Sequence, residues 1–146
     1  MTIHGGSHEG ERGQALVEFA LTIPLVFLLI FSVIDFARLL YAFDLVTGAA
    51  RVGSRYAMVH GPACTAVPGC AATATQIQTY VRTTMSGVDS STVTVATTWP
   101  PAGGCAGGTP VQGCPVLVQV TYPFQFAIVS SLTIPIVNSS QLVVTR

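Results

Sequence analysis

One long apolar stretch constrains this 146-residue sequence more than any other feature. From Phe19 to Ile34 the chain has sixteen uncharged residues, and twelve of them are Phe, Leu, Ile or Val. Each such side chain favours insertion into lipid by about 0.3–0.6 kcal/mol at the centre of a bilayer. Counted from Ala15, the stretch is long enough for a helix to cross a ~30 Å hydrocarbon core. Because Asp35 ends the apolar run, we predict a membrane-spanning helix over residues 14–35.

Pro24 lies inside this stretch, and we expect a kink there rather than an end, because membrane helices tolerate proline.

Two simpler interpretations of the stretch stay open. A cleaved secretory signal would have a shorter apolar region followed by a small-x-small cleavage site. No such site follows Ile34 directly, since the next residues are DFARLLYAFD. The other interpretation is an ordinary uncleaved single-pass anchor, which predicts the same helix.

The helix is predicted to continue beyond the membrane as an amphipathic stalk over residues 36–60. Residues 36–57 contain no proline and many good helix formers, and Gly61-Pro62 should end the helix. At about 100° per residue, Asp44, Arg51 and Arg55 fall on one side of it. These three charges either set the register with partner helices through ion pairs or form a solvated face, and the sequence favours neither.

All four cysteines lie in the remaining segment, residues 61–146, and they are Cys64, Cys70, Cys105 and Cys114. An even number of cysteines on one side of a membrane span indicates disulfides in an oxidising compartment. Three pairings are possible; the local one closes two short loops, CTAVPGC and CAGGTPVQGC. A zinc site is the alternative, but zinc ribbons prefer C-x₂-C spacing, which this chain lacks. The segment is therefore predicted to be a disulfide-tied head outside the cytoplasm.

The head has patterns of one short helix and several strands. TATQIQTYVRTTMSG predicts a helix over Ala74–Ser86, and alternating valines predict strands in STVTVATTW, residues 91–99, and VLVQVTYPF, residues 116–124. A last strand is expected over Gln141–Thr145. The apolar residues 124–137 favour core or a packed loop, with a membrane-surface or partner-facing loop as the alternative. We predict an α+β fold: a long N-terminal helix, a short helix and an antiparallel sheet of about three strands.

Composition and motifs argue against an enzyme or a nucleic-acid binder. Only 8% of the residues are charged and the formal net charge is zero, so no basic surface for nucleic acid is expected. Asp89 is the only carboxylate after Asp44, which leaves no paired carboxylates in the head for acid–base chemistry. No GxSxG, phosphate loop or HExxH occurs. We expect no catalytic residues, no cofactor and no metal, and we interpret His4 and His8 as incidental.

The start of the apolar stretch is the most informative part of the sequence. A polar, Gly-rich leader, residues 1–13, is not expected to fold, and GQALVEF follows from Gly13 to Phe19. A carboxylate such as Glu18 at the edge of a lipid helix is costly and usually functional. The arrangement resembles the processing site of type IV pilin-like proteins, and GxxxxEF before an apolar run resembles the Flp/Tad group.

The continuation is similar to the N-terminal part of a TadE-like pseudopilin. It has a G-x-A-x-V-E-F-A start, an acidic-Phe-x-Arg step at Asp35 to Arg38, and an A-A-R-x-G-[AS]-R-Y-A close that ends at Ala57. The resemblance is dense over residues 12–57. It implies a type IV pilin-like fold and a minor pseudopilin of a Tad/Flp-type pilus or secretion system.

The resemblance also implies a maturation pathway. Prepilin peptidase would cut after Gly13, making Gln14 the first mature residue, with Glu18 and Phe19 as part of the processing site. Glu18 could then neutralise the new terminal amine of its own or a neighbouring subunit. The simpler interpretation is that Glu18 only snorkels to the membrane interface. The implied candidates for assembly or register are Glu18, Asp35, Arg38, Asp44, Arg51 and Arg55.

The implied partners are prepilin peptidase, other Tad pilins and pseudopilins, assembly-platform proteins and the lipid bilayer. The expected location is the bacterial cytoplasmic membrane or the pilus, with a single span and the head outside the cytoplasm. Arginines on both sides of the span give little charge bias, so this orientation depends on the resemblance and the cysteines. The alternative function is a permanently anchored envelope protein whose head binds a ligand or partner, and it predicts an uncleaved leader.

Overall fold

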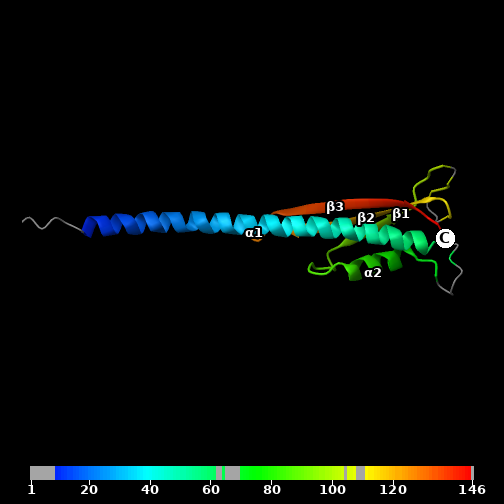
Figure 1. Ribbon diagram of the computed structural model, residues 1–146, viewed down its shortest axis with the longest axis horizontal. Helices are drawn as coiled ribbons and strands as arrows, with labels where there is room; N and C mark the ends of the chain where they lie inside the picture. The colour runs from blue at the N-terminus through cyan, green and yellow to red at the C-terminus, as the bar shows by residue number, and fades with distance from the viewer. Residues whose placement is uncertain (1–8, 62–63, 65–69, 104, 108–110, 146) are drawn as a thin grey trace, which may run out of the picture.

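The protein forms one long helix with a small mixed head packed along its second half (Figure 1). The computed structural model describes residues 9–61, 64, 70–103, 105–107 and 111–145. The elements in chain order are α1 (Glu9–Val59), α2 (Ala74–Thr84), β1 (Thr94–Thr98), β2 (Pro115–Gln125) and β3 (Thr133–Val143). This is the α+β, pilin-like fold that the sequence predicts, with a three-stranded antiparallel sheet and a short helix.

Helix α1 is continuous over 51 residues and passes through Pro24 without a break. It begins at Glu9, so the end of the predicted leader is helical, contrary to the expectation from its glycines. Each glycine costs a helix only about 1 kcal/mol relative to alanine, which does not by itself end one. From Gly13 to Ile34 every side chain is exposed except that of Ile23, which is half-buried. The described head therefore leaves the apolar half of α1 uncovered.

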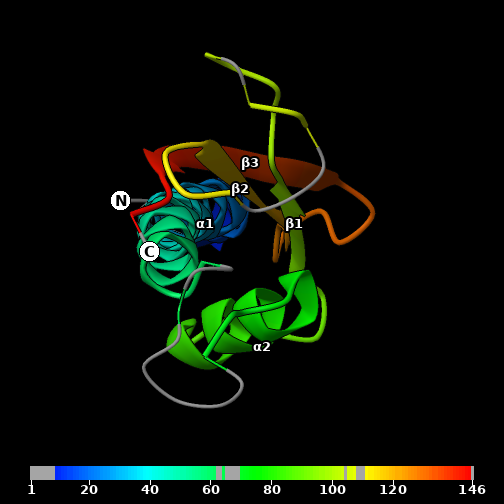
Figure 2. The ribbon, with the colours of Figure 1, turned by 90° about the vertical axis from the view of Figure 1, so that its right-hand side faces the viewer.

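The second half of α1 presents a buried stripe of small residues to the head. The members recur at helical spacing, and they are Ala42, Val46, Ala49, Ala50, Gly53, Ser54 and Ala57. Viewed along α1, the sheet lies on one side of the helix and α2 on another (Figure 2). At Gly53 all three layers meet: an added Cβ would lie 2.7 Å from Val81 Cγ2 of α2 and 3.0 Å from Val118 Cγ1 of β2. The small side chains let the sheet and α2 approach the α1 backbone closely.

The sheet has the strand order β1-β2-β3, and β2 lies in the middle. Val116, Val118 and Val120 alternate along β2 and are fully buried, as expected for a strand with one face on the core. The hairpin of β2 and β3 is long, with register from Pro115 opposite Val143 to Gln125 opposite Thr133.

The third strand begins earlier than the sequence predicts. It covers Thr133–Val143 rather than Gln141–Thr145. Pro135 and the polar residues of TIPIVNSS hide the strand pattern. Proline is tolerated here because β3 is an edge strand, whose outer backbone groups need no partner in the sheet.

Helix α2 begins with a capping box, in which Thr73 and Gln76 satisfy each other's backbone amides. Ile77 and Val81 bury its apolar side. Arg82 donates from Nε and Nη2 to the Val93 carbonyl oxygen at 3.1 and 2.8 Å, which fixes α2 to the segment before β1. The helix ends at Thr84, two residues before the predicted end, since Met85 is already extended and buried.

Candidate functional site

The chemically distinctive site of the head lies where the apolar run of α1 ends. Asp35 is only 3% exposed. Its Oδ2 accepts from the Ala127 amide at 2.9 Å and the Ile128 amide at 3.2 Å. Its Oδ1 accepts from the Ala127 amide at 3.2 Å and from Arg38 Nη1 at 3.0 Å. A carboxylate that accepts several charge-assisted hydrogen bonds holds its partners firmly, so Asp35 clamps the β2–β3 connection to α1.

Arg38 completes this clamp from the next turn of α1. Its guanidinium pairs with Asp35 and lies 5.6 Å from the centroid of the Phe124 ring, which is a favourable position for a cation. Half of the Arg38 side chain is exposed, whereas Asp35 is buried. The acidic-Phe-x-Arg step thus has a role within the chain that the sequence did not indicate.

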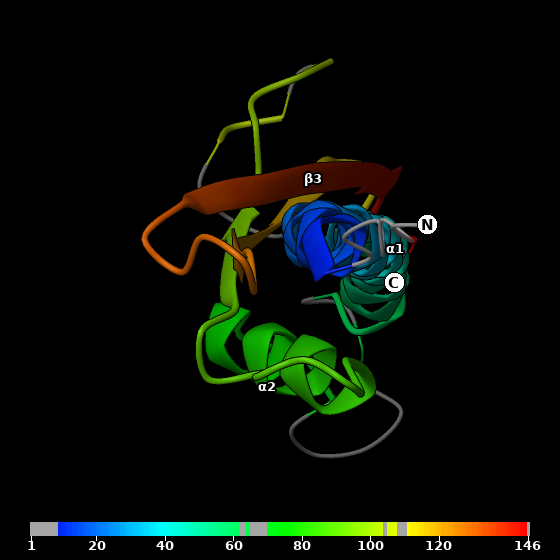
Figure 3. The ribbon, with the colours of Figure 1, turned by 90° about the vertical axis from the view of Figure 1, so that its left-hand side faces the viewer.

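The segment clamped by Asp35, Phe126–Leu132, forms the tip of the long hairpin and lies beside α1 (Figure 3). We call it the hairpin tip. A groove of about 380 Å³ separates it from α1 and is lined by Leu28, Ser32 and Phe36 of the helix.

For residues 124–137 the sequence predicts core or a packed loop, with a membrane-surface or partner-facing loop as the alternative. Phe124 and Ile136 are buried and Phe126 packs against the core, in agreement with the first interpretation. Ile128, Val129 and Leu132 of the tip are about half exposed, because the head ends there.

The predicted processing segment lies on the uncovered half of α1. Gln14, Glu18 and Phe19 are exposed, and no heavy atom lies within 4 Å of a Cβ added at Gly13. Thr22 Oγ1 donates to the Glu18 carbonyl oxygen at 2.7 Å. Among the side chains that the structure describes, from residue 13 onward, none makes a hydrogen bond or an ion pair with the Glu18 carboxylate. The segment is therefore sterically open, and the structure brings no head residue to it.

The three stalk charges point away from the core. Asp44, Arg51 and Arg55 are exposed. Asp44 borders a groove of about 460 Å³ between α1 and α2. None of the three makes an ion pair with another residue that the structure describes. Both interpretations of these charges, register with partners or a solvated face, stay open.

Polar contacts that the sequence did not indicate join β3 to α1. Asn138 Nδ2 donates to Thr47 Oγ1 at 2.7 Å, and Ser54 Oγ donates to Ser140 Oγ at 2.8 Å. With the Asp35 clamp at one end and the Thr145 contact to the Met58 carbonyl at the other, they run the length of the strand. Single serines and threonines in a helix give no sequence signal of such pairing, because their partners lie far away in the chain.

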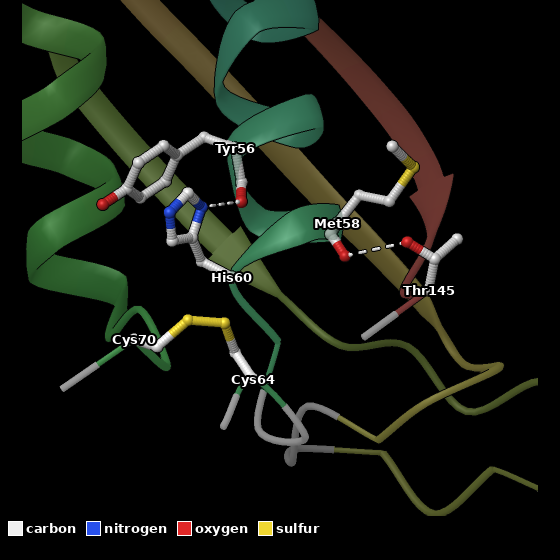
Figure 4. The surroundings of a disulfide bond; sticks show 6 residues. All are labelled: Tyr56, Met58, His60, Cys64, Cys70 and Thr145. Carbon is white, nitrogen blue, oxygen red and sulfur yellow. Dashed lines mark hydrogen bonds between the residues drawn. A yellow bond between two sulfur atoms is a disulfide. The ribbon is translucent and has the colours of Figure 1, made fainter. Parts of the chain in front are cut away.

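The far end of the head carries the disulfides. Cys64 pairs with Cys70 and Cys105 with Cys114, with Cα atoms 5.4 and 5.7 Å apart. This is the local pairing among the three, and it replaces the zinc alternative. Figure 4 shows the first disulfide beside the end of α1, where His60 Nδ1 lies 3.0 Å from the Tyr56 carbonyl oxygen.

Few features of the described head suggest chemistry. In the parts of the chain that the structure describes, no three His, Cys, Asp or Glu side chains gather as a metal site. The Ser91 hydroxyl and backbone amide both donate to Asp89, which holds the pKa of that carboxyl below its ordinary value. Asp89 is exposed in a loop before β1, so this turn is structural.

The fold and site together define a class: an α+β, pilin-like protein with one helix long and apolar enough to cross a membrane. The family model described as TadE-like protein matches residues 13–55. The resemblance to TadE-like pseudopilins is thereby confirmed over the segment that carries Glu18, Asp35 and Arg38. No curated protein and no solved structure matches the chain. The family suggests a protein associated with a Tad pilus.

Proposed function

We propose that this protein is a minor pseudopilin of a Tad/Flp-type pilus or secretion system and acts structurally in pilus assembly, without enzymatic activity. One observation carries the proposal: the TadE-like segment, residues 13–55, lies in a helix whose apolar half has every side chain exposed except that of Ile23. In a membrane, lipid acyl chains would cover this apolar surface. In a filament, the equivalent helices of other subunits would cover it.

Maturation by prepilin peptidase is the first step of the proposed mechanism. Cleavage after Gly13 would remove the polar leader and leave Gln14 with a positively charged amine. The exposure of Gln14, Glu18 and Phe19 supports access by the peptidase. The Glu18 carboxylate, four residues from the new amine and free of described head contacts, is suited to neutralise such an amine at the lipid boundary.

The proposed location is the bacterial cytoplasmic membrane, with the cleaved end of α1 on the cytoplasmic side and the head outside. The two disulfides support an oxidising compartment for the head. Partners would be prepilin peptidase, other Tad pilins and pseudopilins, and assembly-platform proteins. The exposed charges Asp44, Arg51 and Arg55 are the side chains available for register with such partners.

The test is the intact mass of the protein recovered from membranes of its native host, with and without the host's prepilin peptidase. We expect a chain that begins at Gln14 only when the peptidase is present. Gly13→Leu should abolish the cleavage, whereas Gly10→Leu, at another glycine of the same leader, should retain it. A full-length chain in both hosts would contradict the proposal. It would favour a permanently anchored envelope protein whose head binds a ligand or partner.

A further inference from the structure

The hairpin tip lies at the level of α1 where the predicted span ends. Asp35, the last residue of that span, is the residue that holds Ala127 and Ile128. The groove between the tip and α1 is lined by Ser32 and Leu28. At 1.5 Å per residue, these lie about 5 and 10 Å deeper in the span than Asp35. If α1 crosses a bilayer, the tip must therefore sit at or below its surface.

The surface of the tip is apolar along the groove, where Ile128, Val129 and Leu132 lie opposite α1. Its sequence, FAIVSSL, contains no charge, and Ile128, Val129 and Leu132 are each 48% exposed. Connecting loops that face water are normally polar. A cluster of exposed aliphatic side chains at the end of a hairpin indicates a surface that is covered in the working protein.

Several backbone amides of the tip donate hydrogen bonds to partners within the protein. The Ala127 and Ile128 amides donate to Asp35, the Leu132 amide donates to the Val129 carbonyl oxygen at 2.9 Å, and the Phe126 amide donates to the Leu132 carbonyl oxygen at 3.4 Å. Backbone groups that enter lipid must find partners within the protein. Four of the seven amides of the tip are paired in this way, so the tip loses less on leaving water than a loop with no paired amides does.

We propose that the hairpin tip inserts the side chains of Ile128, Val129 and Leu132 into the leaflet on the head side of the membrane, beside α1. The Asp35 clamp sets its depth, and Arg38, one turn nearer the head and half exposed, lies at the level of the lipid phosphates. The helix residues across the groove from the tip lie about 5 and 10 Å deeper than Asp35, which is the depth range of interfacial segments. The head is thus held at two points, the span and the tip, which fixes its orientation on the membrane.

The inference rests on the membrane span of α1, which the proposed function also requires. A bilayer is favoured over a protein partner because the tip is continuous with the apolar half of α1 through the shared groove. Insertion of α1 therefore brings the tip to lipid without any additional partner.

Tryptophan fluorescence in vesicles tests the proposal with the full chain. The chain has one tryptophan, Trp99, so Trp99→Phe gives a background free of tryptophan. Three probes are added singly to it: Val129→Trp at the tip, Leu21→Trp in the span, and Val111→Trp as the matched control. Val111 is 45% exposed and precedes β2, at the opposite end of the head from the tip. The vesicles contain phosphatidylcholine and phosphatidylglycerol brominated near the top of the acyl chains.

We expect the tip probe to lose about half of its fluorescence or more, as an interfacial position requires, and the Val111 probe to lose none. Quenching of the span probe without quenching of the tip probe would overturn the inference and leave the span intact. A blue-shifted but unquenched tip probe would also overturn it and would assign the tip to a protein contact, such as a second copy. An unquenched span probe would refute the insertion of α1, and with it both the inference and the proposed function. Absence of free thiols in each variant verifies that the head has folded.

Discussion

At the scale of single residues, the buried Asp35 carboxylate joins α1 to the hairpin tip through hydrogen bonds to two backbone amides. The sequence marks Asp35 as the charge that stops the apolar run, but it gives no sign of its partners. The Ala127 amide lies 92 residues away in the chain, and backbone donors carry no sequence signal at all. The role of Asp35 therefore became visible only from the structure.

Asp35→Asn should loosen the hairpin tip without unfolding the head. An asparagine offers one carbonyl oxygen in place of two carboxylate oxygens, and its NH₂ group would face amides that need an acceptor. We expect amide hydrogen exchange at Ala127 and Ile128 to accelerate about tenfold or more, as for a locally opened segment. Asp44→Asn, at an exposed carboxylate of the same helix, is the control and should leave both rates unchanged. Equal exchange rates in the two variants would show that Asp35 does not hold the hairpin tip.

Replacing two different glycines of α1 by alanine should change the stability of the protein in opposite directions. Gly53→Ala would place a methyl group 2.7 Å from Val81 Cγ2, and such overpacking costs about 1–3 kcal/mol. At Gly48 an added Cβ meets nothing within 4 Å, so Gly48→Ala should gain about 0.5–1 kcal/mol from helix propensity. Thermal unfolding followed by circular dichroism in detergent should give a lower midpoint for the first variant and a higher one for the second. A rise in both would show that the three layers can separate at Gly53 without cost.

At the scale of elements, local patterns predicted what depends on local sequence. The capped helix that begins at Ala74 and the valine alternation of β2 follow from neighbouring side chains. Strand β3 was only partly predicted, because its first half gains its conformation from pairing with β2 rather than from its own pattern. The sequence left the tip open between core or a packed loop and a membrane-surface or partner-facing loop, because apolar residues look like core until the surrounding elements are placed.

The disulfide between Cys105 and Cys114 should stabilise the head more than the disulfide between Cys64 and Cys70 does. It ties the loop between β1 and β2, and Cys114 is buried directly before Pro115, where β2 begins. The Cys64–Cys70 bond closes a shorter loop after α1. We expect Cys105→Ser with Cys114→Ser to lower the free energy of unfolding by about 2–3 kcal/mol.

The matched variant, Cys64→Ser with Cys70→Ser, should lose less. Denaturant titrations of both double variants measure the two losses directly. A larger loss in the second variant would mean that the segment after α1, and not the β1–β2 connection, limits the stability of the head.

At the scale of the whole molecule, α1 divides the protein into two environments. The sheet and α2 pack on its second half, whereas its first half is exposed apart from Ile23 and borders the head only at the hairpin tip. The sequence predicted an apolar run followed by an amphipathic segment, but it did not indicate that the small side chains of that segment are the ones that pack on the head. What it could not predict is where the head stops along α1, because that point is set by the long-range contact between Asp35 and the hairpin tip.

The separation of the two halves predicts that Glu18 can be changed without harm to the fold. Glu18 is exposed and belongs to the uncovered half, so Glu18→Ala should leave the unfolding midpoint and both disulfides as they are.

If the Glu18 carboxylate neutralises the terminal amine of a subunit during assembly, removing it leaves that charge unpaired in lipid. We expect pilus output, measured by shearing and immunoblotting in the native host, to fall by about tenfold or more, the change that a loss of about 1.4 kcal/mol produces in a single association equilibrium. Asp89→Asn, at an exposed carboxylate in a loop of the head, is the control and should leave pilus output unchanged. Unchanged output in the Glu18 variant, with normal processing, would refute the assembly role and reduce Glu18 to a residue that only reaches the membrane interface.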